Sequence, residues 1–282
     1  MRVVIDTNCL QSQELRDFLA MSPDHKAVLP DYVMMEAFKP RQWDGLRAAF
    51  SVLSQFPDQV IALQGSATVS ALNPDAVVMA DAMISSSETV AFRAFCEQIK
   101  AADGDPHIAA ELHRRATWAQ DQMDRMLTAW SDMETTLAAV SQCFTPAELA
   151  DMRRDRPTAE AFQRFVGVVE AMAIEVFQSK PELIRPSPES LVDHFVFRNA
   201  LCLGVLMVEH LRKGARTRKA KRARNDAIDV LLATYATYFD GIMSEDGLTN
   251  EAFHVGRDLL QAWGAKVGGH YLEHFGASAP KA

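Results

Sequence analysis

The chain has 282 residues, of which 48% are hydrophobic and 23% charged, and its net charge is −8. This is typical of a soluble globular protein with a full hydrophobic core. The longest apolar run, residues 199–208, is about half a membrane span, and the residues before the first acid are too few for a signal peptide. Four cysteines without a CxxC pair argue against a zinc knuckle and a disulfide framework. We therefore expect a cytoplasmic protein that does not enter a membrane.

The first 65 residues alternate between strand-like and helix-like segments. Short apolar runs at 2–7, 26–30 and 58–64 predict strands. Helical spacing of apolar residues predicts helices at 11–21, 31–39 and 43–56. Strands that alternate with helices indicate βαβ units and a parallel sheet.

The middle of the chain, from about residue 70 to 210, has almost no strand signal. Apolar residues recur there every three or four positions, which predicts long helices. Helix-breaking sequences separate these helices at 102–106, 144–146, 154–157 and 185–188. The Met and aromatic residues of this block are expected in the core of a helical bundle rather than around a cofactor.

The alternating pattern returns after residue 225. Residues 226–239 and 251–263 predict helices, 240–244 predicts a short strand, and 265–272 a possible last strand. The fold class that we predict is therefore α/β, with a parallel sheet and a large inserted all-α region.

The expected domain organisation is discontinuous. Residues 1–65 and 190–275 are expected to form the α/β domain, and residues 66–189 are expected to form the helical insertion between its two halves.

Five acidic residues occupy positions that a site at the edge of the sheet would use. Asp6 and Asp246 directly follow short apolar strands, and Glu36, Asp226 and Asp229 lie near the starts of helices. Because the carboxyl ends of parallel strands lie at one edge of a sheet, these acids could converge there. Asp226 and Asp229 are three residues apart and share one helix face. The simpler alternative is that Asp6 only caps the helix that follows it.

A convergence of carboxylates needs a counter-charge. Two carboxylates about 4 Å apart repel each other by roughly 4 kcal/mol at an effective dielectric constant near 20. Either the carboxylates share protons, or a hard divalent cation neutralises them. Mg²⁺ and Mn²⁺ prefer oxygen ligands and are commonly held by a few carboxylates together with substrate phosphates. Such a cation lowers the pKa of a bound water and stabilises the charge that develops on a phosphodiester.

Three segments together resemble the PIN-domain nucleases: VVIDTN (3–8), LPDYVMMEAFK (29–39) and NDAIDVLLATYATYFDGIMSED (225–246). That family has a first strand ending in Asp-Thr-Asn or Asp-Ser-Asn and a Glu on the second helix. A third acid opens a helix rich in small residues, and a fourth follows a strand ending in Thr or Ser. The resemblance covers about half of the chain and implies a three-layer PIN-like fold around the parallel sheet. The long helical block departs from the family, which usually has a short helical hairpin there.

The resemblance implies a role for each acid. The implied catalytic residues are Asp6, Glu36, Asp229 and Asp246. The first, third and fourth of these would hold Mg²⁺ or Mn²⁺, and Glu36 would complete the metal shell or orient the attacking water. The implied supporting residues are Thr7, Asn8 and Ser244.

The third acid is a choice between two residues of one helix. Asp229 is preferred because Ala233 and Ala236 then occupy the small positions four and seven residues further on. Asp226, one turn earlier on the same face, is the alternative metal ligand.

The segment 212–224 is strongly basic. It has eight basic residues and no acidic one, so that with +8 here and −8 on the whole chain the rest carries −16. Such a cluster can neutralise several phosphates. The candidate RNA-binding residues are Arg216, Arg218, Lys219, Lys221, Arg222 and Arg224. The alternative is a solvated surface loop.

The function that we expect is Mg²⁺- or Mn²⁺-dependent endoribonuclease activity on single-stranded RNA, as a toxin of a toxin–antitoxin pair, a defence effector or a processing enzyme. DNA is the alternative substrate. Candidates for further partners are an antitoxin or other protein bound to the helical insertion, and a second copy of the chain. The competing hypotheses are a non-catalytic RNA- or protein-binding scaffold and a phosphatase-like hydrolase that uses the same carboxylates.

Overall fold

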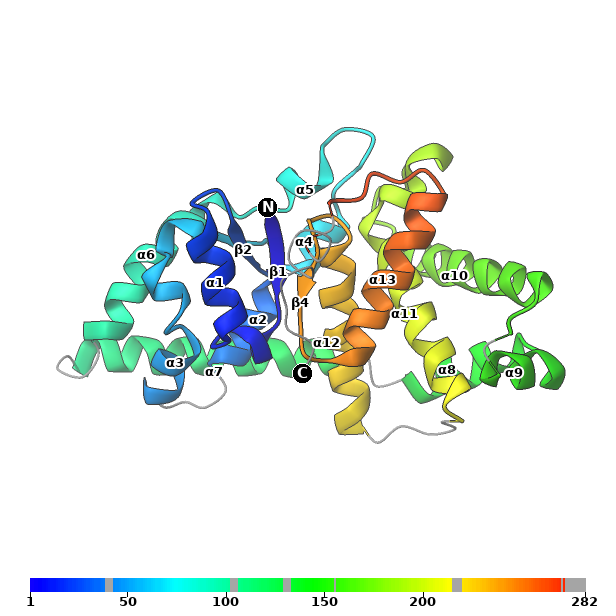
Figure 1. The fold of residues 1–282 in the computed structure, drawn as a ribbon, viewed down its shortest axis with the longest axis horizontal. Helices are drawn as coiled ribbons and strands as arrows, with labels where there is room; N and C mark the ends of the chain where they lie inside the picture. The colour runs from blue at the N-terminus through cyan, green and yellow to red at the C-terminus, as the bar shows by residue number, and fades with distance from the viewer. Residues whose placement is uncertain are drawn as a thin grey trace.

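The structure is a computed structural model that describes residues 1–38, 43–101, 106–128, 133–154, 156–214, 220–269 and 271. Within these residues it is a mixed α/β protein (Figure 1). Its strands form one parallel sheet in the order β3-β2-β1-β4. The strands are β1 Arg2–Ile5, β2 Lys26–Leu29, β3 Val60–Ala62 and β4 Ile242–Met243.

Helices make up most of the remaining described residues. The α-helices are α1 Gln13–Met21, α2 Asp31–Ala37, α3 Trp43–Ala49, α4 Ser66–Ser70, α5 Met79–Ala82, α6 Ser86–Ala101, α7 Pro106–Thr128, α8 Met133–Gln142, α9 Pro146–Arg153, α10 Ala159–Ser179, α11 Phe195–Arg212, α12 Ala220–Ala236 and α13 Gly247–Ala262. The short 3₁₀ helices are η1 Thr7–Cys9, η2 Leu53–Gln55, η3 Pro57–Gln59 and η4 Pro188–Asp193.

The two central strands are buried, as the apolar runs predict. Val3, Val4 and Ile5 of β1 are fully buried, as are Ala27 and Val28 of β2. A strand of a parallel sheet that is covered on both faces needs an apolar side chain at every position, which a continuous β-branched run supplies. The four predicted strands at 2–7, 26–30, 58–64 and 240–244 are confirmed by β1, β2, β3 and β4.

One hydrophobic core surrounds the sheet. α12 packs against β1 and β4, α6 packs against β3, and α7 packs against α2. The core includes Val4 of β1, Phe92 of α6, Met123 of α7 and Tyr235 of α12. Figure 1 shows the sheet and α1 to α7 in its left and central parts, with α12 beside β4.

A second hydrophobic core lies among the helices on the right of Figure 1. α11 packs against α8, α9, α10, α12 and α13, and Leu201 of α11 is fully buried there beside Val169 and Leu260. The apolar run 199–208 therefore forms the middle of α11, and no helix in the described parts of the chain is long and apolar enough to cross a bilayer. The expected division at residues 66 and 189 stays a prediction. α6 and α7 share the core of the sheet, whereas α8 to α10 share the second core.

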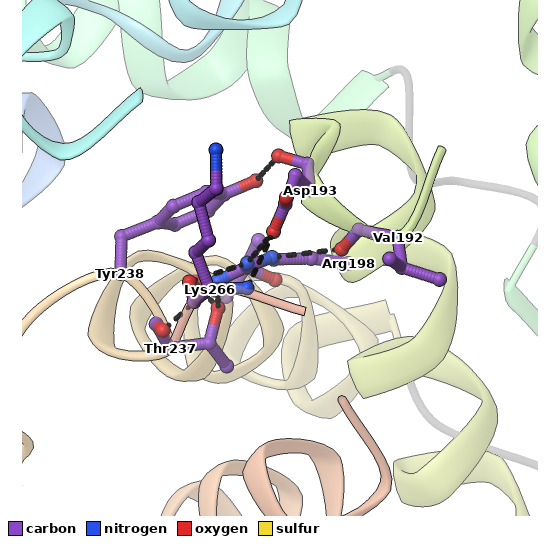
Figure 2. Close-up of polar contacts among 7 residues, drawn as sticks. Val192, Asp193, Arg198, Thr237, Tyr238 and Lys266 are labelled. Atoms are coloured by element: carbon purple, nitrogen blue, oxygen red, sulfur yellow. Dashed lines mark hydrogen bonds and ion pairs between the residues drawn. The ribbon is translucent and has the colours of Figure 1, made fainter. Parts of the chain in front are cut away.

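A fully buried arginine, Arg198 of α11, connects several segments of the chain (Figure 2). The Arg198 guanidinium of α11 donates hydrogen bonds to the carbonyl oxygens of Val192 (3.0 Å), Thr237 (2.9 Å) and Lys266 (2.8 Å) and to the Asp193 carboxylate (2.7 Å). The central carbon of the guanidinium, Arg198 Cζ, lies 3.9 Å from the centre of the Tyr238 ring. One side chain thus connects η4, α11, the end of α12 and the segment after α13.

The possible last strand at 265–272 is wrong where the structure describes it, because residues 265–269 and 271 form no strand. Their backbone instead bonds to side chains of other segments: Lys266 N donates to Asp193 Oδ1 and Gly269 N donates to Asp240 Oδ1, both at 2.9 Å. At Gly268 an added Cβ would lie 1.9 Å from the Phe239 carbonyl oxygen, so this close approach requires glycine.

Candidate metal centre

Asp6 and Ser244 lie opposite each other at the carboxyl ends of β1 and β4. The parallel register pairs Ile5 with Met243, which places the next residue of each strand side by side. Asp6 N donates to the Met243 carbonyl oxygen (2.9 Å), and Ser244 Oγ donates to Asp6 Oδ2 (2.5 Å). Asp6 is buried, with 7% of its surface exposed. Burial raises the pKa of its carboxyl, the Ser244 hydroxyl lowers it, and the charge of Glu36 raises it further.

Asp246 stands at the start of α13 and caps that helix. Its Oδ1 accepts hydrogen bonds from Leu248 N (2.7 Å) and Thr249 N (2.9 Å), and its own N donates to Ser244 Oγ (3.1 Å). Ser244 therefore bonds to both Asp6 and Asp246. A carboxylate at a helix N-terminus is stabilised by the N–H groups it accepts from.

Thr7 and Asn8 hold two neighbouring segments in place. Thr7 Oγ1 donates to Glu36 Oε2 (2.9 Å), which ties α2 to the turn after β1. Asn8 Oδ1 accepts from Glu245 N (3.3 Å), which ties the same turn to the loop after β4. The three polar residues expected to support the acids thus bond either to an acid or to the loop that carries one.

Asp229 lies on α12 and is electrostatically coupled to the other acids. Its pKa is raised to about 8, first by burial and next by the charge of Asp246, while a Thr249 hydrogen bond lowers it. The charges of Asp6 and Asp226 raise it further. The largest charge effects on Asp229 are thus all from carboxylates, which favours its neutral form.

Asp226 has a different partner. It is buried, and its Oδ2 lies 3.2 Å from Nε2 of His210, which is buried on α11. Of the two candidates for the third acid, Asp229 is therefore the one grouped with Asp6 and Asp246, whereas Asp226 is paired across the α11–α12 contact.

Asp31 and Tyr32 are two residues at this edge that sequence reasoning missed. Asp31 follows β2 after one proline, and burial raises its pKa to about 6. Tyr32 is fully buried, and its hydroxyl has no hydrogen-bond partner among the described residues. Burial raises its pKa well above the usual value, and the charges of Asp31, Asp6 and Asp229 add to this effect. An acid directly after a short apolar run, the same signal as at Asp6, could have identified Asp31.

The acids come together from separate segments but do not form a closed metal site. Within the described part of the chain, no three His, Cys, Asp or Glu side chains are arranged to hold a metal ion.

The basic segment is described only in part. Of its candidate RNA-binding residues, Arg216, Arg218 and Lys219 lie outside the described residues. Lys221, Arg222 and Arg224 lie in the first turns of α12, the helix that carries Asp229.

Comparisons with protein-family models, with curated proteins and with solved structures find no match to this chain. The resemblance to the PIN-domain nucleases therefore rests on the three sequence segments alone.

Proposed function

We propose that this chain is a Mg²⁺- or Mn²⁺-dependent phosphodiesterase of PIN-like fold that hydrolyses single-stranded RNA. The observation that carries the proposal is the position of Ser244 between two acids at one edge of the sheet: its hydroxyl donates to Asp6 Oδ2 (2.5 Å) and accepts from Asp246 N (3.1 Å). The charges of the same two acids raise the pKa of Asp229. These three carboxylates come from the end of β1, from α12 and from the loop after β4, and burial leaves the charges of Asp6 and Asp229 poorly screened.

The donor set fits a hard divalent cation. Asp6, Asp229 and Asp246 supply carboxylate oxygens, the ligand type that Mg²⁺ and Mn²⁺ prefer. Without a cation Asp229 is neutral below a pH of about 8, so cation binding replaces a proton there. The unpartnered Tyr32 hydroxyl, buried near two of these acids, is a further donor for an oxygen ligand. Among the described residues the carboxylates are not arranged to coordinate one ion, so cation binding would require them to move.

The surrounding residues position this set. A bound cation would supply an activated water and charge neutralisation on the phosphodiester. Ser244 orients the Asp6 carboxylate through its hydroxyl, and Thr7 orients Glu36, which accepts a hydrogen bond from the attacking water. The basic segment 212–224 holds the RNA backbone close to the N-terminal turns of α12.

A non-catalytic binding scaffold is the second candidate. It is favoured by the use of Asp246 as a helix cap and by the lack of a three-ligand arrangement among the described residues. The two candidates differ in whether the purified chain turns over RNA.

The test is cleavage of RNA, single-stranded DNA and a phosphomonoester by the purified chain with and without Mn²⁺. Asp6→Asn and Asp229→Asn should each abolish RNA cleavage. Asp6→Asn should also raise the melting temperature in metal-free buffer, because it removes one of several repelling carboxylates. Asp226→Asn is the matched control: it removes an acid from the same helix face, but one paired with His210, and should keep most of the activity.

Four results would contradict all or part of this assignment. Full activity in Asp6→Asn would rule out the proposed metal centre. Loss of activity in Asp226→Asn but not in Asp229→Asn would mean that the third metal ligand lies one turn earlier on α12. Turnover of the phosphomonoester but not of RNA would indicate a phosphatase. Binding of RNA without any cleavage by the wild type would favour the scaffold.

A further inference from the structure

α7 is a long amphipathic helix, with one face buried in the core that surrounds the sheet and the opposite face exposed. Its Ala119 and Met123 are buried in the core that surrounds the sheet, and the helix packs against α2. α2 carries Glu36, whose carboxylate accepts the Thr7 hydrogen bond at the candidate metal centre. α7 is thus fixed beside one of the elements that build the site.

The outer face of α7 presents an exposed tryptophan between basic residues. Trp118 is 57% exposed. His107, Arg114 and Arg125, all exposed, lie 11 and 4 residues before it and 7 residues after it. At 3.6 residues per turn these spacings put the four side chains within about 20° of one line along the helix. The indole is therefore flanked along the helix axis by the guanidinium groups of Arg114 and Arg125.

Acidic residues also lie on α7. Glu111 forms ion pairs with Arg114 and Arg115, whose side chains are 75% and 44% exposed. Ion pairs this exposed contribute little to stability, so a phosphate can replace the carboxylate as a partner of either arginine. Asp121 and Asp124 are also exposed on α7, so that the helix carries three arginines and three acids. Attraction of a phosphate therefore depends on Arg114 and Arg125, the two arginines nearest the line of Trp118.

We propose that this face of α7 is a stacking platform for single-stranded RNA, with a base on the Trp118 indole and phosphates on Arg114 and Arg125. The assignment rests on the proposed function, since it extends the substrate path of that site. Unpaired bases offer their faces to an aromatic ring, and arginines track the backbone, which together is how single strands are bound. In a duplex those faces are already stacked. For a protein partner, one exposed ring among charged side chains offers no apolar interface core.

The test measures affinity in a background that does not cleave RNA. Asp6→Asn protein in EDTA is titrated into a labelled single-stranded RNA oligonucleotide and followed by fluorescence anisotropy over a range of salt. Trp118→Ala should weaken binding roughly 5- to 100-fold and leave the salt slope unchanged, because no charge is removed. Trp118→Tyr should retain most of the affinity. Arg114→Gln and Arg125→Gln should each lower the salt slope by about 0.7.

Phe162→Ala is the matched control, because Phe162 is an exposed aromatic residue of α10, 42% exposed. It should leave the affinity unchanged. The proposal is overturned if Trp118→Ala binds like its parent, if Phe162→Ala weakens binding equally, if the parent binds no single-stranded RNA, or if Trp118→Ala alters only the oligomeric state. If the wild type cleaves RNA but Trp118→Ala binds it normally, the stacking platform is wrong and the proposed nuclease activity stands. If binding depends on Trp118 but the wild type does not cleave RNA, the platform stands and the proposed nuclease activity is wrong.

Discussion

Asp31 is a carboxylic acid outside the proposed metal ligands whose ionisation the fold changes. Burial raises its pKa to about 6, whereas in the unfolded chain it has the ordinary value of an aspartate. The folded protein therefore holds a proton between about pH 4 and 6 that the unfolded chain has released. Stability falls as the pH rises through this window and stays at the lower level above it.

Asp31→Asn should remove this part of the pH dependence. The variant should be more stable than wild type above pH 6, by at most about 3 kcal/mol, and should show no gain at pH 4. Urea unfolding at pH 4, 5, 6 and 7 measures the difference. Asp17→Asn, which changes an exposed carboxylate of α1, serves as the control and should show parallel curves. Parallel curves for Asp31→Asn would mean that Asp31 is as easily ionised as a surface acid.

The acids show what local sequence can and cannot predict about a site. A carboxylate directly after a short buried strand is a local signal, and it predicted that Asp6 and Asp246 lie near each other. The choice between Asp226 and Asp229 was only weakly indicated, because it depends on His210, which lies 16 residues away on another helix. The Tyr32 hydroxyl, which has no hydrogen-bond partner in the part of the chain that the structure describes, has no sequence signal.

At the scale of elements, Arg198 makes the connection between α11 and its neighbours depend on one planar group (Figure 2). Arg198→Lys should destabilise the protein by about 3–5 kcal/mol, because an ammonium cannot reach all of the acceptors and leaves the Asp193 charge without its partner. Thermal and urea unfolding measure the loss. Arg164→Lys is the control, because the Arg164 guanidinium is half exposed beside Glu148 and its loss should cost no more than about 1 kcal/mol. Equal stability of the two variants would show that the buried network contributes nothing special.

The elements themselves were predictable where burial repeats along the chain. The β-branched run of β1 and the apolar run of β2 are buried at nearly every position, so the local pattern alone predicts these strands. The segment 265–269 has a similar local composition but is held by Asp193 and Asp240 from other segments. Local pattern cannot distinguish a strand from a loop whose backbone bonds to distant side chains.

At the scale of the whole molecule, charge is separated rather than balanced. The chain carries −8, yet segment 212–224 carries +8. Replacing Arg216, Arg218, Lys219 and Lys221 by Gln together should weaken RNA binding, because fewer counterions are released, and lower the salt slope by roughly 0.7 per lost phosphate contact. Anisotropy titrations with oligonucleotides of different sequence should show nearly equal losses, since phosphates carry no sequence information. An unchanged salt slope would identify the segment as a solvated loop.

The strand order also determines when the sheet can be completed during synthesis of the chain. Asp6 meets Ser244 across 238 positions of sequence, a stretch that a ribosome takes roughly 12 to 48 s to synthesise at about 5–20 residues per second. Until then the side of β1 that will pair with β4 is an open strand edge, which can pair with other chains. Two residues, Ile242 and Met243, close that edge. A polypeptide released before Ile242 and Met243 are synthesised therefore keeps an open strand edge that can pair with strands of other chains. In such a polypeptide Asp6 also lacks the Ser244 hydroxyl.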